Sequence, residues 1–230
     1  LALDLVRGAD HSTGLKIELM LSHLACADEP GHPMNEAQRL RFETLRTRLP
    51  PAAASLANSS GIFLGAPYHY DLVRPGMALY GLNPTPADAN PMAPVFRLEA
   101  PILQIRQIER GESVGYGASF RAAGPTVVAT AGLGYGDGYF RALGQRGYGF
   151  LRGHKIPIIG RISMDLVTLD ITGLTPAARE GEMIEFLGPH VTPEEVAGLA
   201  GTVGYEILTS LGDRYARRFI GAEGAPCCVL

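Results

Sequence analysis

The sequence predicts an α/β segment followed by a β-rich domain, and three observations support this fold class. Residues 1 to about 92 alternate short apolar runs with one stretch of helical periodicity, as βα units do. A proline-rich stretch, LNPTPADANPMAP at 82–94, has little apolar periodicity and marks a boundary. Residues 93–230 then contain short β-rich runs separated by Gly and Pro. We therefore expect two domains, 1–92 and 93–230.

The clearest helix of the first domain is predicted over 35–49, NEAQRLRFETLRTRL. Asn35 is the expected cap, with Gln38 reaching back to it from the third helical position. Phe42, Leu45 and Leu49 are spaced by three and four residues and form the expected apolar face. The two prolines that follow end the pattern.

The second domain is predicted to be mainly β-structure. Its β-rich runs lie at 96–108, 126–133, 155–171 and 182–188. One helix interrupts them: Thr192 is the expected cap, Pro193 its first residue, and Glu195 completes a capping box. We expect Val196, Leu199, Ala200 and Val203 to face inward.

Composition restricts the class of partner. The chain is 46% hydrophobic and 19% charged with a net charge of −3, which is typical of a soluble globular protein. It has no basic run for nucleic acid, and no apolar run approaches the roughly 18 residues of a membrane span. Cys26, Cys227 and Cys228 show no metal-ligand spacing, and the first residues show no signal-peptide pattern. We expect a reduced, cytoplasmic protein with a small-molecule ligand, no nucleic acid and no membrane.

Six segments occur in a fixed order along the chain. They are SHLACADE at 22–29, ANSS at 57–60, YDLVRPGMALYGL at 70–82, GESVGYGASF at 111–120, GLGYGDGY at 132–139 and GRISMD at 160–165. Together they resemble the alanine racemase family of fold-type III pyridoxal-phosphate enzymes. The resemblance implies the last βα units of a (β/α)8 barrel followed by a β-rich domain. It also implies interconversion of L- and D-alanine through a pyridoxal 5'-phosphate aldimine, which supplies D-alanine for the cell wall.

The resemblance assigns the catalytic residues to Tyr116, His23 and Arg74. A phenol with a pKa of about 10 is a poor base at neutral pH, so it needs a positive or hydrogen-bonding neighbour. In the family the histidine bridges the arginine to the tyrosine. The alternative for an isolated tyrosine between glycines is half-buried packing. A metal site built on His23 is disfavoured, because the spacing of the nearby acidic residues and His32 matches no zinc pattern.

The remaining site residues are assigned by the same resemblance. Cofactor-binding residues are Ser59, Arg74, Gly76, Met77 and Tyr205, with Arg74 donating to the pyridine nitrogen and the others holding the phosphate. Substrate-binding residues are Met164, through its backbone, Asp165, and Tyr135 near the entrance. The structural alternatives are a surface serine, a packed aromatic residue at 205 and a glycine-rich hairpin around 132–138.

Lysine marks the point where the resemblance is incomplete. The family uses two bases on opposite faces of the α-carbon: the tyrosine, and a lysine that first binds the cofactor. Lys16 and Lys155 are the only lysines of the chain, and neither lies in the family's Lys-Ala-Asn-Ala-Tyr-Gly motif. We therefore expect a C-terminal fragment of a family member that is inactive by itself and belongs to a homodimer with shared active sites.

Two other functions remain open from the sequence. One is a related barrel-type decarboxylase of a basic amino acid, although such enzymes lack the paired GYGAS and GRISMD motifs. The other is a non-catalytic binding module formed by the β-rich domain. A partial barrel would expose strand edges and an apolar interior, so we expect residues 1–92 to be poorly soluble in isolation.

Overall fold

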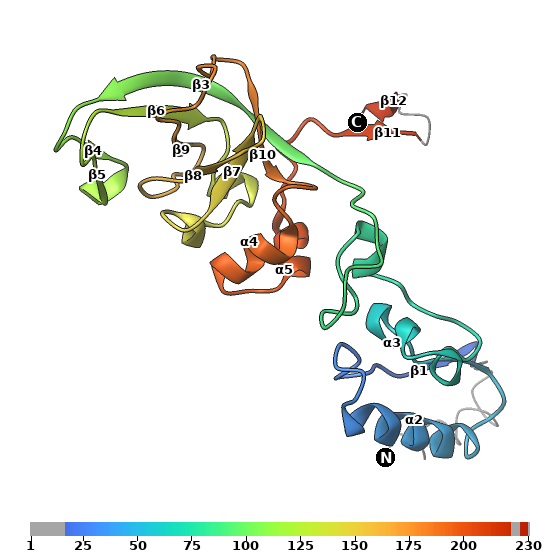
Figure 1. The fold of residues 1–230 in the computed structure, drawn as a ribbon. Helices are drawn as coiled ribbons and strands as arrows, with labels where there is room; N and C mark the ends of the chain where they lie inside the picture. The colour runs from blue at the N-terminus through green and yellow to red at the C-terminus, as the bar shows by residue number, and fades with distance from the viewer. Residues whose placement is uncertain (1–16, 222–225, 230) are drawn as a thin grey trace. The chain divides into compact units, whose positions relative to one another are not determined.

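The computed structural model describes residues 17–221 and 226–229 and divides the chain into two compact units (Figure 1). The first unit is Leu1–Val95 and the second is Phe96–Leu230. The proline-rich stretch 82–94 lies at the end of the first unit. The two units are described separately below.

The first unit contains one complete βαβ connection. Strand β1 (Leu19–Leu21) pairs in parallel with β2 (Ala53–Ser55), with Met20 opposite Ala54. Parallel neighbours need a crossover, which here contains helix α2 (Pro33–Arg46). After β2 come helix α3 (Ser59–Phe63) and the 3₁₀ turns η1 (Ala66–Tyr68) and η2 (Met77–Tyr80). The small core contains Leu24, Ala27, Phe42, Ala54 and Leu56.

The predicted bounds and cap of helix α2 are wrong. The helix begins at Pro33, and the His32 ring accepts the Met34 N–H at 3.1 Å, because Pro33 fixes a helical φ two residues before the expected cap. Asn35 is therefore a buried helical residue whose amide donates to the Glu29 carbonyl. The helix ends at Arg46 rather than at Leu49. Of the expected apolar face, Phe42 is buried and Leu45 is exposed.

The second unit is built on a six-stranded antiparallel sheet with the order β8-β7-β10-β3-β6-β9. The bounds are β3 Leu98–Ile108, β6 Thr126–Ala131, β7 Tyr148–Leu151, β8 His154–Pro157, β9 Val167–Asp170 and β10 Met183–Leu187. Two short antiparallel pairs accompany it, β4 (Ser113–Val114) with β5 (Phe120–Arg121), and β11 (Arg218–Ile220) with β12 (Pro226–Val229). Strand β7 was not predicted, and 155–171 forms two strands instead of one run.

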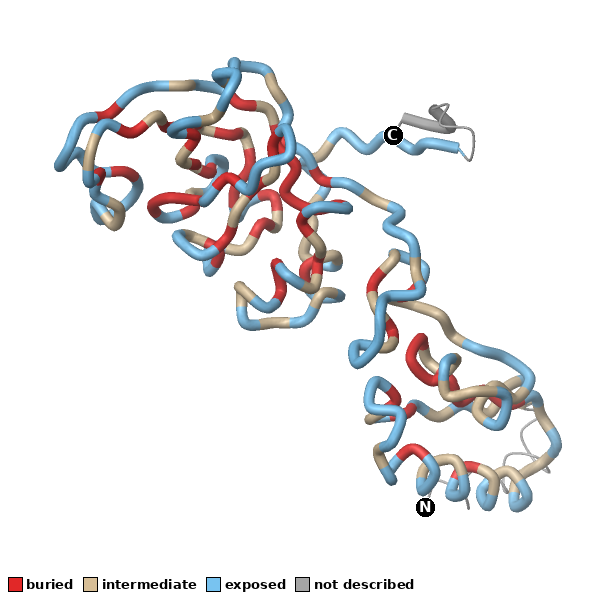
Figure 2. Tube along the Cα trace, viewed as in Figure 1, coloured by how far each residue is buried: buried red, intermediate tan, exposed pale blue. Residues whose placement is uncertain are grey.

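Buried positions concentrate in the sheet of the second unit (Figure 2). Strand β6 buries Thr126, Val128, Ala129 and Ala131, and Leu169 on β9 and Phe186 on β10 are fully covered. Tyr139 lies edge-on to Phe186, with ring centroids 5.4 Å apart. This core fixes the turns that follow β6 and β8.

Two helices follow the sheet. Helix α4 (Pro193–Ala200) begins with the predicted capping box: Thr192 Oγ accepts the Glu195 N–H at 3.2 Å, and the Glu195 carboxylate accepts the Thr192 N–H at 3.2 Å. Val196 is buried as expected, but Val203 is 66% exposed because it lies beyond the Gly201 cap. The second helix, α5 (Gly204–Ser210), was not predicted.

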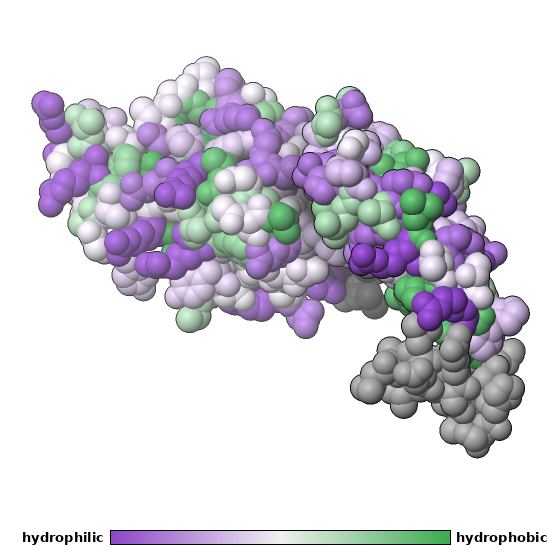
Figure 3. All heavy atoms as spheres, turned by 90° about the horizontal axis from the view of Figure 1, so that it is seen from below, coloured by the Kyte–Doolittle hydropathy of each residue, from purple (hydrophilic) through white to green (hydrophobic). Residues whose placement is uncertain are grey.

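Among the residues that the structure describes, no helix is long and apolar enough to cross a membrane. On the face shown in Figure 3, hydrophobic residues lie in small groups between polar ones.

Candidate functional site

Arg74 and His23 meet in the first unit, as the sequence predicted for two residues of one site. The Arg74 guanidinium donates through Nη1 to Ser55 Oγ at 2.5 Å and through Nη2 to the Ser22 carbonyl at 2.6 Å. Nη2 also lies 3.4 Å from Nδ1 of His23. Ser55 is the last residue of β2 and Ser22 directly follows β1, so the carboxyl-terminal ends of both parallel strands orient this arginine.

Two donors face the His23 ring. Arg74 Nη2 lies 3.4 Å from Nδ1, and the Asn58 Nδ2 atom is 3.2 Å from Nε2, while the Asn58 Oδ1 atom accepts the Gly61 N–H at 2.9 Å. A neutral imidazole has one acceptor nitrogen, so the ring accepts from Arg74 or from Asn58 but not from both at once. The exposed His23 ring thus lies between two donors.

Gln38 supports the loop that carries His23, whereas the sequence predicted that it would reach back to a cap at Asn35. Its Oε1 atom accepts the Ala25 N–H at 2.9 Å, and its Nε2 atom donates to the His23 carbonyl at 3.0 Å. Helix α2 therefore holds the backbone on both sides of Leu24. The available sequence signal was an amide side chain one turn before Phe42, on the helix face that is partly covered.

Ser59 forms the centre of a small anion cradle. Its buried hydroxyl accepts the Gly76 N–H at 2.8 Å and the Ala78 N–H at 3.3 Å. Two backbone N–H groups that converge on one oxygen are the donors that a phosphate group also prefers. Met77 lies between them at the start of η2, so the structure brings together three of the predicted phosphate-binding residues.

Tyr116 lies in the second unit, in a turn held by backbone packing. Gly115 and Gly117 have φ of +78° and +70°, and a Cβ at Gly115 would lie 2.9 Å from the Arg161 amide nitrogen. A Cβ at Gly160 would in turn lie 2.9 Å from the Val114 carbonyl oxygen. The glycines thus let the segments around 115 and 160 touch. The Tyr116 side chain is 70% exposed, which excludes the packed-aromatic alternative within this chain.

Tyr135 and Met164 lie on two adjoining turns of the second unit. The Tyr135 N–H donates to the Ser163 carbonyl at 3.0 Å, and the Gly136 N–H donates to the Met164 carbonyl at 2.8 Å. Gly134 approaches the Met164 backbone so closely that a Cβ would overlap it. Residues 135–137 form the 3₁₀ turn η4, so the glycine-rich hairpin alternative is wrong. Tyr135, Met164 and the neighbouring Asp165 are all exposed.

Tyr205 lies in the first turn of α5, in the second unit, and is 41% exposed. Ser59, with which the sequence grouped it, belongs to the first unit. The predicted site residues thus form one group around His23, Ser59 and Arg74 and another around Tyr116, Tyr135 and Met164.

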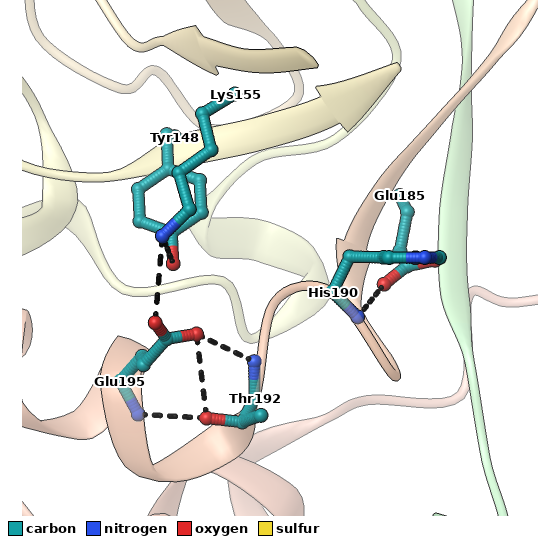
Figure 4. A network of polar contacts seen from close by, with 6 residues as sticks. All are labelled: Tyr148, Lys155, Glu185, His190, Thr192 and Glu195. Carbon is teal, nitrogen blue, oxygen red and sulfur yellow. Dashed lines mark hydrogen bonds and ion pairs between the residues drawn. The ribbon is translucent and has the colours of Figure 1, made fainter. Parts of the chain in front are cut away.

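Lys155 is unsuited to bind a carbonyl compound. Its Nζ atom donates to the Tyr148 hydroxyl at 3.0 Å and lies 3.5 Å from Glu195 Oε1 (Figure 4). The hydrogen bond to Tyr148 is the main cause that raises the pKa of Lys155, and the nearby Glu195 carboxylate adds to it. An amine needs its neutral form to attack a carbonyl, so this position disfavours that chemistry. Lys16 lies outside the described residues.

Within residues 17–221, no group of three or more His, Cys, Asp or Glu side chains is arranged to hold a metal ion. The backbone carbonyl of Glu29, close to His23 in the sequence, accepts the Asn35 side-chain amide.

Two family models cover nearly the whole chain. The alanine racemase N-terminal domain matches residues 1–84, and the alanine racemase C-terminal domain matches residues 95–219. The catabolic alanine racemase of Mesorhizobium japonicum is 54% identical over 209 residues, which are 90% of this chain and 54% of that protein. The alanine racemase of Rhodospirillum rubrum is 51% identical over 206 residues, 89% of this chain and 55% of that protein.

Solved structures give the same result. The alanine racemase of Bartonella henselae, with covalently bound pyridoxal phosphate, superposes with a TM-score of 0.86 at 41% identity, over 92% of this chain and 59% of that chain. The biosynthetic enzyme of Pseudomonas aeruginosa gives 0.84 at 34% identity, over 95% and 61%.

A parallel strand pair with a buried serine hydroxyl that accepts backbone N–H groups, followed by a β-rich unit, defines a protein of the barrel-plus-β-domain class. The predicted fold class is confirmed. This chain belongs to the alanine racemase family. It spans about half the length of the curated relatives that it matches.

Proposed function

We propose that this chain is part of an alanine racemase that interconverts L- and D-alanine with pyridoxal 5'-phosphate. The observation that carries the proposal is the paired arrangement in the first unit: Arg74 bound to His23, and the Ser59 hydroxyl beneath two backbone N–H groups. The Arg74–His23 pair supplies a positive charge and a group that relays a proton, which suits the pyridine ring. The N–H groups around Ser59 supply an anion-binding site, which suits the phosphate substituent.

The residues present fit this cofactor. Ser59, Gly76 and Met77 would hold the phosphate, since the backbone N–H groups of Gly76 and Ala78 already converge beside the Ser59 hydroxyl. Arg74 would donate to the pyridine nitrogen, and Ser55 and Ser22 hold it in a fixed orientation for that purpose. Tyr205 is proposed as a further phosphate ligand. When bound, pyridoxal phosphate acts as an electron sink that acidifies the α-proton of an amino acid.

Arg74 would also set the outcome of the reaction. A guanidinium stays protonated and only donates, so it disfavours a proton on the pyridine nitrogen. Less negative charge then drains into the ring, which favours return of the proton to the α-carbon over transamination.

Tyr116 is the proposed base for one face of the α-carbon. Its phenolate oxygen would take the α-proton and become a phenol, and the donors around His23 and Arg74 would stabilise the phenolate before the transfer. The exposure of Tyr116 and the contact between Arg74 and His23 support this assignment. We propose that Tyr116 serves the cofactor held by a second copy of the protein, in a homodimer with shared sites.

The opposite base is proposed to be a lysine outside the 230 residues. Lys155 is bound to Tyr148 and protonated, and the other lysine, Lys16, has no matching sequence context. The isolated chain is therefore expected to be inactive. The Met164 backbone, Asp165 and Tyr135 are proposed to receive the substrate carboxylate and to line its entrance.

The cellular role proposed is cytoplasmic supply of D-alanine for the cell wall. Because the reaction is reversible, the same site also suits the catabolic role named for the Mesorhizobium japonicum relative. The decarboxylase and the non-catalytic module are disfavoured by the alanine racemase matches over both units.

The test uses an active enzyme that carries this chain, with Tyr116→Phe and Tyr148→Phe as matched variants. We expect Tyr116→Phe to slow racemisation by at least about 100-fold, because a general base typically contributes 10²–10⁴-fold. Incorporation of solvent deuterium should be lost from one enantiomer far more than from the other. Tyr148→Phe, which removes only the hydroxyl bound to Lys155, should retain activity. Racemisation by Tyr116→Phe at the rate of the unmodified enzyme, with unchanged deuterium incorporation from both enantiomers, would refute the assigned role.

A further inference from the structure

Arg214 joins three segments that lie far apart in the sequence. Its Nη2 atom donates to Asp165 Oδ1 at 2.7 Å, and its Nε atom lies 3.3 Å from Asp137 Oδ1. Its Nη1 atom lies so near Gly136 that a Cβ there would be 2.5 Å away. The planar guanidinium therefore covers the turn of 135–137 and reaches the end of the segment 160–165.

Both segments joined by Arg214 carry predicted substrate residues. Asp137 follows Tyr135 by two positions, and Asp165 follows Met164 directly. The Asp137 carboxylate is nearly buried and uses Oδ2 to accept the Gly134 N–H at 2.8 Å, which leaves Oδ1 for Arg214. The Gly136 N–H donates to the Met164 carbonyl. Arg214 thus adds a side-chain link to a backbone contact that fixes where the Met164 backbone lies.

We propose that Arg214 is a positioning residue of the amino-acid site, which sets the Met164–Asp165 turn against the Tyr135 turn. The proposal rests on the proposed function, since that function gives these turns their substrate. Arg214 itself does not contact the reacting atoms. It acts through the orientation of the Met164 backbone and the Tyr135 side chain.

The contacts of Arg214 favour a role in positioning the two turns over a role in stabilising the fold. The side chains of Arg214 and Asp165 are 52% and 56% exposed, and exposed ion pairs contribute little to the stability of a fold. A guanidinium can hold two carboxylates from two directions at once, whereas the single ammonium of lysine at this distance cannot keep both contacts. Arg214→Lys should therefore keep a positive charge near Asp137 and lose the link to Asp165.

The first experiment measures the link without using activity. Hydrogen exchange by mass spectrometry is recorded on the 230-residue chain for Arg214→Lys, Asp165→Asn and the control Arg217→Ala. Arg217 is on the same segment, has the same exposure and pairs only locally, with Asp213 and the Gly212 carbonyl. We expect the first two variants to exchange at least about five-fold faster in 133–139 and 160–166, with the control unchanged. Unchanged exchange in those segments overturns the proposal.

The second experiment measures kinetics in an active enzyme that carries this chain. Arg214→Lys should raise KM for alanine by about 10-fold with a smaller change in kcat, because misplacing a binding turn weakens the bound geometry. Arg217→Ala should leave both constants unchanged. An unchanged KM together with faster exchange overturns the positioning role. If the unmodified enzyme showed no racemisation, the proposed function would fail, while the exchange experiment would still judge the link.

Discussion

At the scale of single residues, the Ser59 hydroxyl is the proposed centre of the phosphate site. It is buried and accepts two backbone N–H groups. Ser60, its neighbour, is also buried but does not belong to the cradle. The pair offers a matched comparison.

Ser59→Ala should weaken binding of pyridoxal phosphate by roughly 10- to 100-fold, because a hydrogen bond to a charged group contributes about 1.5–3 kcal/mol. Equilibrium dialysis of the 230-residue chain against the cofactor measures this directly. Ser60→Ala is the control and should bind as the unmodified chain does. Equal affinities for Ser59→Ala and the unmodified chain would show that the phosphate lies elsewhere.

Residue roles were partly predictable from sequence. His23 and Arg74 were expected to meet and do so, since the Ser22 carbonyl beside His23 and the Ser55 hydroxyl both bind the Arg74 guanidinium. The support of His23 by Gln38 was not predicted, because a hydrogen bond between a helix side chain and a loop 15 residues away depends on tertiary packing. The role proposed for Tyr116 rests on the family resemblance, since the site of its chemistry is proposed to include a second subunit.

At the scale of elements, the turn after β6 depends on close backbone contacts. Gly138 has φ of +92°, and a Cβ there would overlap the Ser210 carbonyl oxygen. Gly153, between β7 and β8, has a similar φ of +84° with nothing within 4 Å of its Cβ position. A substitution at Gly153 therefore tests the strain of a positive φ alone, and a substitution at Gly138 tests that strain together with steric overlap.

Gly138→Ala should lower the free energy of unfolding by more than about 3 kcal/mol, since overlap with a backbone atom adds to the conformational strain. Gly153→Ala should cost only about 1 kcal/mol, from the positive φ alone. Urea unfolding followed by circular dichroism gives both values. Similar costs would mean that the Ser210 segment moves aside freely.

The start of helix α4 is predicted to respond to acid. Partial burial opposes ionisation of Glu195, but the Thr192 N–H and the neighbouring Tyr148 and Lys155 outweigh it and lower the pKa of the carboxyl group. A carboxyl group whose pKa is lower in the folded state stabilises the fold above its unfolded pKa of about 4.5. That contribution is lost as the pH falls through the folded-state pKa.

Glu195→Gln should therefore lower the Tm at pH 7, and the difference from the unmodified chain should vanish as the pH falls through the lowered folded-state pKa of Glu195. Thr192→Ala removes the uncharged half of the capping box and should cost about 1 kcal/mol at pH values above and below that pKa. Thermal unfolding at several pH values makes the comparison. A Tm difference for Glu195→Gln that is constant with pH would contradict the assignment.

At the scale of the whole molecule, the two units differ in the amount of core that they contain. Among the residues that the structure describes, the main cluster of the second unit comprises 22 buried residues, against five in the cluster of the first unit. Within the same residues, the parallel pair β1–β2 has no third strand beside it, which leaves strand edges unpaired. Stability should accordingly be unequal between the units.

A fragment of residues 96–221 should unfold cooperatively on heating, because it contains the complete six-stranded sheet and its core. A fragment of residues 17–95 should show no cooperative transition and should bind the dye ANS, which reports exposed apolar surface. Circular dichroism and fluorescence test the two fragments. A sharp transition without ANS binding in 17–95 would refute the predicted difference.

Elements that depend on a few neighbouring residues were predicted from the sequence, whereas elements that depend on pairing with distant segments were missed. The α4 capping box lies within four consecutive residues and was predicted, as were most strands from their own patterns. Strand β7 was missed because its YGFL segment is short and contains glycine, and it is stabilised by pairing with β8 and β10. The start of α2 was misplaced because Asn35, a favourable cap residue, lies two positions after Pro33, where the helix begins.

The scarcity of lysine gives the chain an unusual behaviour toward reagents that acylate amines. Only two lysines accompany 18 arginines, and Lys155 is kept protonated by its hydroxyl and carboxylate neighbours. Its raised pKa leaves a smaller neutral fraction than in an ordinary lysine, so Lys155 should be acylated more slowly than an unpaired exposed lysine at the same pH. In an assembly that contains this chain, rapid acylation or amine cross-linking would therefore report mainly on the other protein segments present. The chain would contribute little background to a labelling map of its partners.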